Sequence, residues 1–275
     1  MNHMFSQGVF RKTFADTGTS LVLSAIGLIL FVVMFTWAML HMGTEVLNFV
    51  SRVPFIQKIF EMSLGIKVSG DISINVLFAV CFTHGVVMLL IWSVMIATAT
   101  RVTVGEMEKG TADMLLSLPL NRTEIFVSTS CVWGFAALVL AACPLVGIAV
   151  GRQIFITDEV VTLSRFVAPT INLGCLNLAV GSLACMIGTL LQRRSMAVGV
   201  VVGVTFVSVV LNFLEPFLES LKPWRFLSLL TYFKPVETVR DESWPVASMV
   251  TLLAMAFSFW LIGLIVFRRK DVPAV

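Results

Sequence analysis

The chain has 275 residues, of which 58% are hydrophobic and 13% are charged, and its mean hydropathy is +0.97 with a formal net charge of +3. This composition excludes an ordinary soluble domain and indicates a polytopic membrane protein. We expect membrane lipid to surround the protein, and we expect it to bind no nucleic acid.

The first 19 residues precede the first long apolar stretch. They contain no small-residue cleavage site after a short apolar core, so we expect no removable signal peptide. Phe5, Val9 and Phe14 recur at near-helical spacing, and the other side of such a helix is charged. Residues 1–19 are therefore predicted to form an amphipathic helix on the membrane surface. A frayed terminus is the alternative.

Six apolar stretches are long enough to cross a bilayer, because a helix needs about 20 residues to span a core of about 30 Å. Strands with open edges would leave backbone groups without hydrogen bonds in lipid, so these stretches are predicted to be helices. They cover approximately residues 20–42, 73–99, 125–150, 166–191, 195–214 and 246–267. Asn121, followed three residues later by Glu124, resembles a capping box at the start of the third span. We predict an all-α membrane protein with one transmembrane domain over residues 1–275.

Two longer segments between spans, residues 44–65 and 215–244, are apolar but are interrupted by prolines and charges. Neither segment can span the bilayer, whereas aromatic residues such as Trp224 and Trp244 suit the membrane interface. We predict short surface or re-entrant helices on the outer side.

The cations divide almost evenly between the two sides of the membrane. If both termini are cytoplasmic, ten cations are inside and nine are outside. The sequences QRRS (192–195) and FRRK (267–270) directly adjoin spans, where positive charge has most influence on orientation. We therefore expect both termini to lie in the cytoplasm. As a separate expectation, we place the protein in a bacterial inner membrane.

The interiors of the predicted spans contain no Asp, Glu, Lys or Arg, and His84 is the one ionisable side chain there apart from thiols. Ion-coupled carriers usually need intramembrane carboxylates or bases, so the energy for any transport must come from elsewhere. A scaffold that transports nothing would also have uncharged spans.

The cysteines and histidines give no clear metal or cofactor site. The five cysteines all fall within spans and form no C-x-x-C pair, so we interpret them as small buried hydrophobic residues. His41 and His84 could anchor a haem only if they lay at matching depth, and their positions in the sequence disfavour this. We expect no catalytic, cofactor or metal residues in this chain.

Small residues four apart occur in several spans and allow close helix packing in lipid. Gly147 and Gly151 form one G-x-x-x-G motif, and Gly199 and Gly203 form another. Either motif could serve packing within the chain or self-association.

The polar segment GEMEKGTADMLLSLPLNR (105–122) interrupts this apolar chain. Gly105 and Gly110 superficially resemble a phosphate-binding loop, but Thr111 and Ala112 stand where that loop has Lys and Ser or Thr. No paired catalytic carboxylates or nucleophile elbow occur either. We expect no ATPase site and no enzyme activity in the chain itself.

The same segment has the signals of a short helix at the membrane face. Gly110 can end the helix that continues from the second span, and Thr111 can cap a new helix with Asp113 in its first turn. Pro119 would stop that helix. An ordinary solvated loop is the alternative.

This segment resembles the pattern of ABC type-2 permeases, the membrane subunits of ATP-binding-cassette transporters. Their connection between the second and third spans reads Gly-Glu-acid-x-x-Gly-Thr-x-Asp-x-Leu-Leu-Ser-x-Pro-x-x-Arg. The matching residues are Gly105, Glu106, Glu108, Gly110, Thr111, Asp113, Leu115, Leu116, Ser117, Pro119 and Arg122. FRKT (10–13), QRRS (192–195) and RFLSLLTYFKP (225–235) extend the resemblance along most of the chain. One departure is Thr129, where members often have a lysine.

The resemblance implies that a separate ATPase subunit binds this connection on the cytoplasmic face, with a second contact at the turn between the fourth and fifth spans. The residues implied in this coupling are Glu106, Glu108, Gly110, Thr111, Asp113, Pro119, Arg122, Arg193 and Arg194. ATP and Mg²⁺ would bind the partner subunit. Two copies of the permease, or one copy with a close homologue, would enclose a pathway lined mainly by the second and fifth spans.

We therefore expect the permease subunit of an ATP-driven exporter for a hydrophobic or amphiphilic substrate, coupled through residues 100–124. One alternative is a permease dedicated to the maturation or assembly of another protein. The other is a non-transporting membrane anchor of a redox complex.

Overall fold

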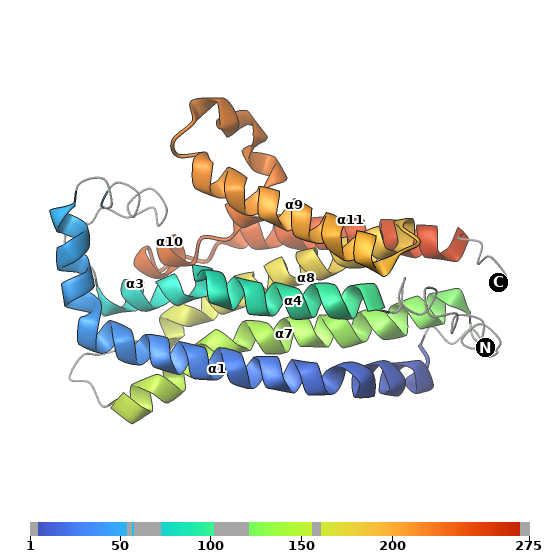
Figure 1. The fold of residues 1–275 in the computed structure, drawn as a ribbon, viewed down its shortest axis with the longest axis horizontal. Coiled ribbons are helices and arrows are strands. Elements are labelled where there is room, and N and C mark those ends of the chain that lie inside the picture. The colour runs from blue at the N-terminus through green and yellow to red at the C-terminus, as the bar shows by residue number, and fades with distance from the viewer. Residues whose placement is uncertain (1–4, 54–56, 58–72, 102–120, 156–160, 270–275) are drawn as a thin grey trace.

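The computed structural model describes residues 5–53, 57, 73–101, 121–155 and 161–269. All regular elements within these residues are helices. Figure 1 shows an elongated bundle in which most of the long helices follow one common axis. The predicted all-α class is confirmed.

Six helical segments of the described chain are long and apolar enough to cross a membrane, as predicted. They are α1 (Gln7–Arg52), α3 (Ile74–Ala79) with α4 (Gly85–Thr100), α7 (Arg122–Phe155), α8 (Val167–Leu190), α9 (Arg194–Leu214) and α11 (Val246–Arg269). Most of these helices begin and end within a few residues of the predicted spans. The agreement arises because the hydropathy of a span and the charges beside it determine where its helix begins and ends.

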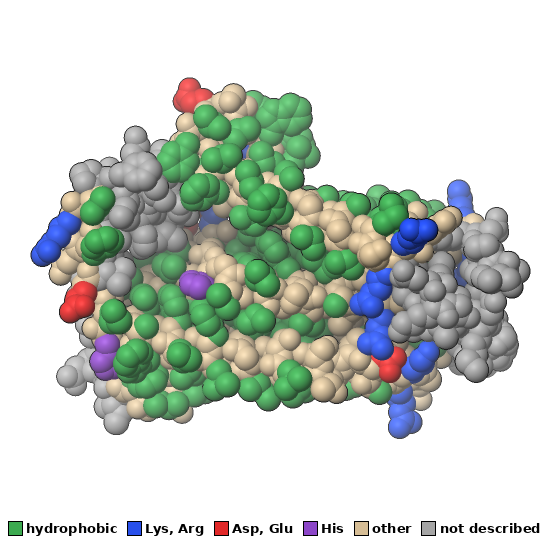
Figure 2. Space-filling model, viewed as in Figure 1, with side chains coloured by type: hydrophobic (Ala, Val, Ile, Leu, Met, Phe, Trp, Pro, Cys, Tyr) green, Lys and Arg blue, Asp and Glu red, His purple; other side chains and the backbone are tan. Residues whose placement is uncertain are grey.

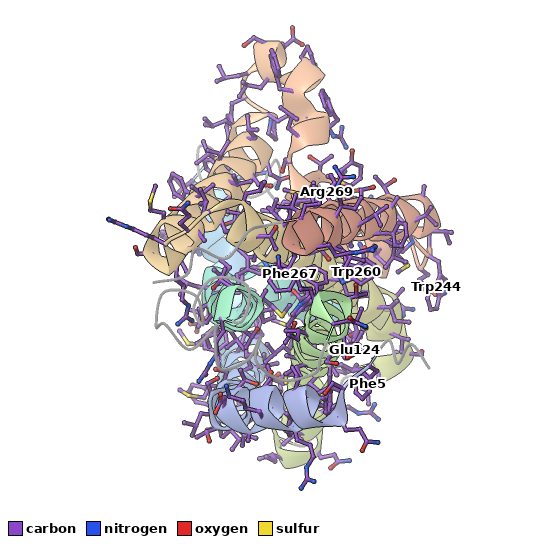
Figure 3. The ribbon with its side chains drawn as sticks, turned by 90° about the vertical axis from the view of Figure 1, so that its right-hand side faces the viewer. Phe5, Glu124, Trp244, Trp260, Phe267 and Arg269 are labelled. Carbon is purple, nitrogen blue, oxygen red and sulfur yellow. The ribbon has the colours of Figure 1, made fainter. Side chains whose placement is uncertain are left out.

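The predicted N-terminal surface helix is continuous with the first span in α1. Figure 3 looks at this end of the bundle and shows the first turns of α1 from the side, while α4 and α7 are seen end-on. Val9, Thr13 and Thr17 form the buried stripe, whereas Phe5 and Phe14 are 42% and 39% exposed. The leader therefore crosses the end of the bundle with Val9 in the core, and the partly exposed ring of Phe14 lies 6.1 Å from the ring of Phe135 on α7. Its placement on the membrane surface stays a prediction.

The second span is broken, which the uninterrupted apolar stretch over 73–99 did not predict. A short 3-10 helix, η1 (Val80–Thr83), follows α3, and the extended backbone of His84 separates it from α4. The Nδ1 atom of His84 accepts a hydrogen bond from the backbone N–H of Val86 at 3.2 Å. The imidazole thereby caps α4, in the way that short polar side chains usually cap helices.

The helix α8 forms the centre of the bundle and contacts α4, α7, α9 and α11. Its side chains are buried along most of its length, including Leu173, Leu176 and Val180. Two buried asparagines fix it to its neighbours. Asn172 donates to the carbonyl of Tyr232, and Asn177 donates to the carbonyl of Ala137, at 3.1 and 3.2 Å.

The two G-x-x-x-G motifs serve different surfaces. A Cβ added at Gly147 would lie 2.6 Å from the Cβ of Val32, and one at Gly151 would lie 2.8 Å from the Cβ of Thr36. The first motif therefore packs α7 directly against α1. A Cβ added at Gly199 or Gly203 would meet nothing within 4 Å, so the second motif faces outward.

The segment after α9 contains short helices, as predicted for residues 215–244. They are η4 (Glu219–Leu227), η5 (Leu229–Tyr232) and α10 (Pro235–Arg240). Figures 1 and 3 show the end of α9 and the following turns projecting from the bundle, while α10 returns to pack beside α3. In the other predicted segment, α1 continues to Arg52, and residues 54–56 and 58–65 lie outside the described chain.

Candidate functional site

Most of the predicted coupling segment, residues 102–120, lies outside the described chain. The predicted site residues in this range are Glu106, Glu108, Gly110, Thr111, Asp113 and Pro119. The structure defines the two points from which the segment leaves the bundle, Arg101 after α4 and Asn121 before α7.

Arg101 joins the end of α4 to the N-terminal leader. Its guanidinium donates to the backbone carbonyl of Asp16 at 2.8 Å and lies 3.4 Å from the Asp16 carboxylate. A cation at the C-terminus of a helix also interacts favourably with the helix dipole. The end of α4 and the first turns of α1 are thus connected by two polar contacts.

Arg194 joins the same end of α4 to the start of α9. Its guanidinium donates to the backbone carbonyl of Ala97 at 3.0 Å. Carbonyls in the last turn of a helix have no regular donor within the helix. The N–H of Arg101 would normally bind the carbonyl of Ala97, but it binds the carbonyl of Thr98. Arg194 therefore satisfies part of this helix end, while Arg193 precedes it as the first residue outside α9.

The start of α7 has half of the predicted capping box. The backbone N–H of Asn121 donates to a carboxylate oxygen of Glu124 at 3.2 Å, and the Glu124 residue is only 8% exposed. Arg122 is the first residue of the helix. The N–H of Ser6 donates to the hydroxyl of Ser128 at 2.8 Å, which fixes the leader to α7 as well.

Cationic side chains gather at this end of the bundle, as Figure 2 shows on its right-hand side. At this end of the bundle, the described cations of the span ends and the leader are Arg11, Lys12, Arg101, Arg122, Arg193, Arg194, Arg268 and Arg269. The described acids of the same segments are Asp16 and Glu124. We call this set the basic end.

The structure brings together some of the predicted site residues and adds two that the sequence did not indicate. Arg193 and Arg194 lie at the start of α9 beside the end of α4, and Arg122 begins α7, which contacts α4. The additional residues are Arg101 and Asp16. Arg101 and Asp16 are 85 positions apart in the sequence, and no sequence motif links them. The only signal for them was that each is a charge close to the end of a span.

The described residues show no group of three or more His, Cys, Asp or Glu side chains that could hold a metal ion. His41 binds the carbonyl of Trp37 within its own helix, whereas His84 caps α4. All five cysteines are free, and four are buried. The polar chemistry of the described chain therefore lies mainly in the links between helix ends.

Six apolar helices with a basic end define a polytopic integral membrane protein. The model of the ABC-2 family transporter protein matches residues 7–272, which is nearly the whole chain. The chain belongs to this family and is a transmembrane permease component of an ABC transporter, as its resemblance indicated. ATP-binding subunits are the partners that this family implies. A search of curated proteins finds no sequence that matches the chain.

Proposed function

We propose that this chain is the permease subunit of an ATP-driven exporter for a hydrophobic or amphiphilic substrate. Residues 100–124 bind a separate ATPase subunit on the cytoplasmic face of a bacterial inner membrane. The observation that carries this proposal is the pair of links at the end of α4, where Arg101 binds Asp16 and Arg194 binds the carbonyl of Ala97.

These links explain how motion of the coupling segment reaches the spans. A force on the segment acts first on α4 (Gly85–Thr100), because Arg101 at the end of that helix directly precedes the segment in the chain. Arg101 transmits the movement to the leader, and Arg194 transmits it to α9. The second and fifth spans and the leader then move together, while α8 remains packed at the centre.

The coupling segment is more acidic than the basic end. Glu106, Glu108 and Asp113 share residues 105–113 with a single cation, Lys109, so this part of the segment carries a net negative charge that a basic patch on the ATPase subunit can recognise. Charge complementarity of this kind gives a protein interface its register and its specificity more than its total affinity. ATP and Mg²⁺ bind the partner subunit in this proposal.

The substrate pathway lies between two copies of the permease. On α9, Gly199, Gly203 and Phe206 are exposed along one helical face, where another helix can approach closely. On α4, Leu89 is 70% exposed although most of that helix is buried. Because these surfaces lack charges, they suit an apolar or amphiphilic substrate.

The basic end supports the cytoplasmic placement of both termini. Arg193, Arg194, Arg268 and Arg269 lie directly at span ends, where the positive-inside rule gives charges most weight. At the other end, Arg52 and Arg152 lie in the last turns of α1 and α7, and Lys222 and Arg225 lie on the projecting segment.

A charge reversal tests the coupling proposal. The chain is co-expressed with its ATPase subunit, and the complex is reconstituted in lipid to measure substrate-stimulated ATP hydrolysis. Glu106→Arg should abolish the stimulation with normal membrane insertion, because it reverses a charge that the family resemblance assigns to the contact with the ATPase. Glu219→Arg, an exposed charge reversal on η4, is the matched control and should retain it. Equal stimulation in both variants would refute the coupling role.

Arg194→Gln separates binding of the ATPase from transmission of its motion. The variant keeps the coupling segment and should co-purify with the ATPase, but its substrate-stimulated hydrolysis should fall because α9 is released from α4. Loss of co-purification would assign Arg194 to the interface itself. A haem absorption band in a complex that contains no ATPase would favour the redox anchor.

A further inference from the structure

A cavity of about 500 Å³ lies between the projecting segment after α9 and the start of α11. This volume falls within the range of about 300–1,000 Å³ that is usual for small-molecule sites. Its wall contains three cations, Lys222, Arg225 and Lys234, together with the aromatic rings of Phe226 and Tyr232. None of the described residues that line it is a carboxylate, so the cavity offers positive charge to a ligand.

Each of the three cations has an acidic neighbour outside the cavity wall. The ion pairs are Lys222–Glu219 at 3.0 Å, Arg225–Glu215 at 3.8 Å and Lys234–Glu237 at 2.9 Å. Exposed pairs of this kind contribute little to stability and leave a cation able to bind a second anion. The long contact of Arg225 matters most, because a guanidinium has five N–H donors and can bind a phosphate through two of them.

The cavity wall is fixed by buried hydrogen bonds. The hydroxyls of Ser208 on α9 and Ser228 before η5 lie 2.9 Å apart, and the N–H of Leu229 donates to the Ser208 hydroxyl at 2.8 Å. Asn172 of α8 donates to the carbonyl of Tyr232 at 3.1 Å. Two helices, α9 and α8, thus hold η5 in place, and this side of the cavity is a preformed feature rather than a gap beside a loose turn.

The surroundings of the cavity have the composition of a membrane interface. Trp224 and Phe226 are 56% and 59% exposed on η4, and Trp244 is 56% exposed before α11. Exposed aromatic rings among cations are typical of the level where lipid headgroups lie. Figure 3 shows this segment standing out from the side of the bundle, where lipid can reach it.

We propose that this cavity binds a phosphate group, carried by the headgroup of an anionic phospholipid at the membrane interface. Arg225 and the two lysines contact the phosphate oxygens, and the rings of Phe226 and Tyr232 lie against the glycerol and the upper acyl chain. The proposal needs neither the ATPase partner nor any assumption about transport.

Two neighbouring substitutions on α11 test the site without removing an ion pair. Ala247 lines the cavity, whereas Val246, which is 59% exposed, does not. The full chain is equilibrated with mixed phosphatidylglycerol and phosphatidylcholine vesicles, solubilised, and analysed by native mass spectrometry for retained lipid. Ala247→Glu should lower the retained phosphatidylglycerol at least about five-fold, the effect expected of one charge near a headgroup. Val246→Glu should retain it like the wild type.

Removing the cation gives an independent measurement. Arg225→Gln should also reduce retention of phosphatidylglycerol about five-fold, and Arg225→Lys should restore part of it because a lysine keeps the charge but loses the paired donors. Far-UV circular dichroism and size-exclusion chromatography establish that each variant is folded before lipid is measured.

Inorganic phosphate distinguishes the source of the ligand. If phosphate raises the unfolding temperature of the wild type but not of Ala247→Glu, while no lipid is retained, the site is supported with soluble phosphate as its ligand. If phosphatidylglycerol and phosphatidylcholine are retained equally and phosphate has no effect, the proposal is wrong. The proposal is also wrong if Ala247→Glu and Val246→Glu retain equal amounts of phosphatidylglycerol.

Discussion

The contact between α1 and α7 predicts the effect of a single added methyl group. Gly147→Ala would place a Cβ 2.6 Å from the Cβ of Val32, 2.7 Å from its Cγ1 and 3.2 Å from the carbonyl oxygen of Ile29. Carbon atoms normally approach to about 3.5–4.0 Å, so the two helices must separate by about 1 Å locally. The Cβ of Val32 cannot rotate away, because it is fixed to the backbone.

The expected cost follows from two opposing effects. Overpacking a well-filled interior usually costs about 1–3 kcal/mol, while Gly to Ala in a helix gains about 1 kcal/mol. We expect a net loss of up to about 2 kcal/mol in the free energy of unfolding for Gly147→Ala. Gly203→Ala is the matched control, because it adds a methyl group to the other glycine motif with nothing within 4 Å. It should show no loss.

The measurement is reversible unfolding of the detergent-solubilised chain in mixed micelles with increasing sodium dodecyl sulfate, followed by circular dichroism. A double-mutant cycle identifies the contact: Val32→Gly should relieve Gly147→Ala, with a coupling energy of about 1–2 kcal/mol. If Gly147→Ala is as stable as Gly203→Ala, or if the cycle shows no coupling, the packing of α7 on α1 described above is incorrect.

Two further predictions use the same unfolding measurement. His84→Ala removes the acceptor for the N–H of Val86 and should cost about 1 kcal/mol in the free energy of unfolding. His84→Asn should retain most of the stability, because asparagine caps helices well. Equal losses in the two variants would exclude the capping role of His84. Ser130→Ala leaves the indole N–H of Trp260 without its acceptor at 2.9 Å and should cost about 1–3 kcal/mol, whereas Ser258→Ala removes a hydroxyl that bonds only its own helix and should be nearly neutral.

The spans could be predicted from the sequence because hydropathy and length determine them in lipid. The break at His84 could not be predicted in this way, because the flanking sequence VCFTHGVVM is apolar on both sides and contains no proline. Its stability comes from tertiary contacts, since the imidazole lies against the rings of Phe31 and Phe35 on α1, with centroids 5.0 and 5.8 Å away. The hydropathy pattern around His84 carries no information about the rings of Phe31 and Phe35, which lie about fifty residues earlier in the chain.

The glycine motifs show the same limit. Gly147 with Gly151 and Gly199 with Gly203 have identical spacing, and the sequence left both packing and self-association open for each. The difference arises from which face of each helix is covered by a neighbour. Which face of a helix is covered depends on the order of the helices around α8, and the hydropathy pattern does not determine this order.

The links of Arg101 and Arg194 suggest why the polar chemistry of this protein lies at helix ends. A charge inside a span would be costly in lipid, so a permease whose spans are uncharged can connect them by polar contacts only where they leave the membrane. Both arginines bind backbone carbonyl oxygens, of Asp16 and Ala97, and these acceptors persist whatever side chains surround them. In the function proposed above, links of this kind transmit movement of α4 without an ionisable group in the membrane. The energy for transport would then enter through residues 102–120, and the spans would need to provide only apolar surfaces that separate and close.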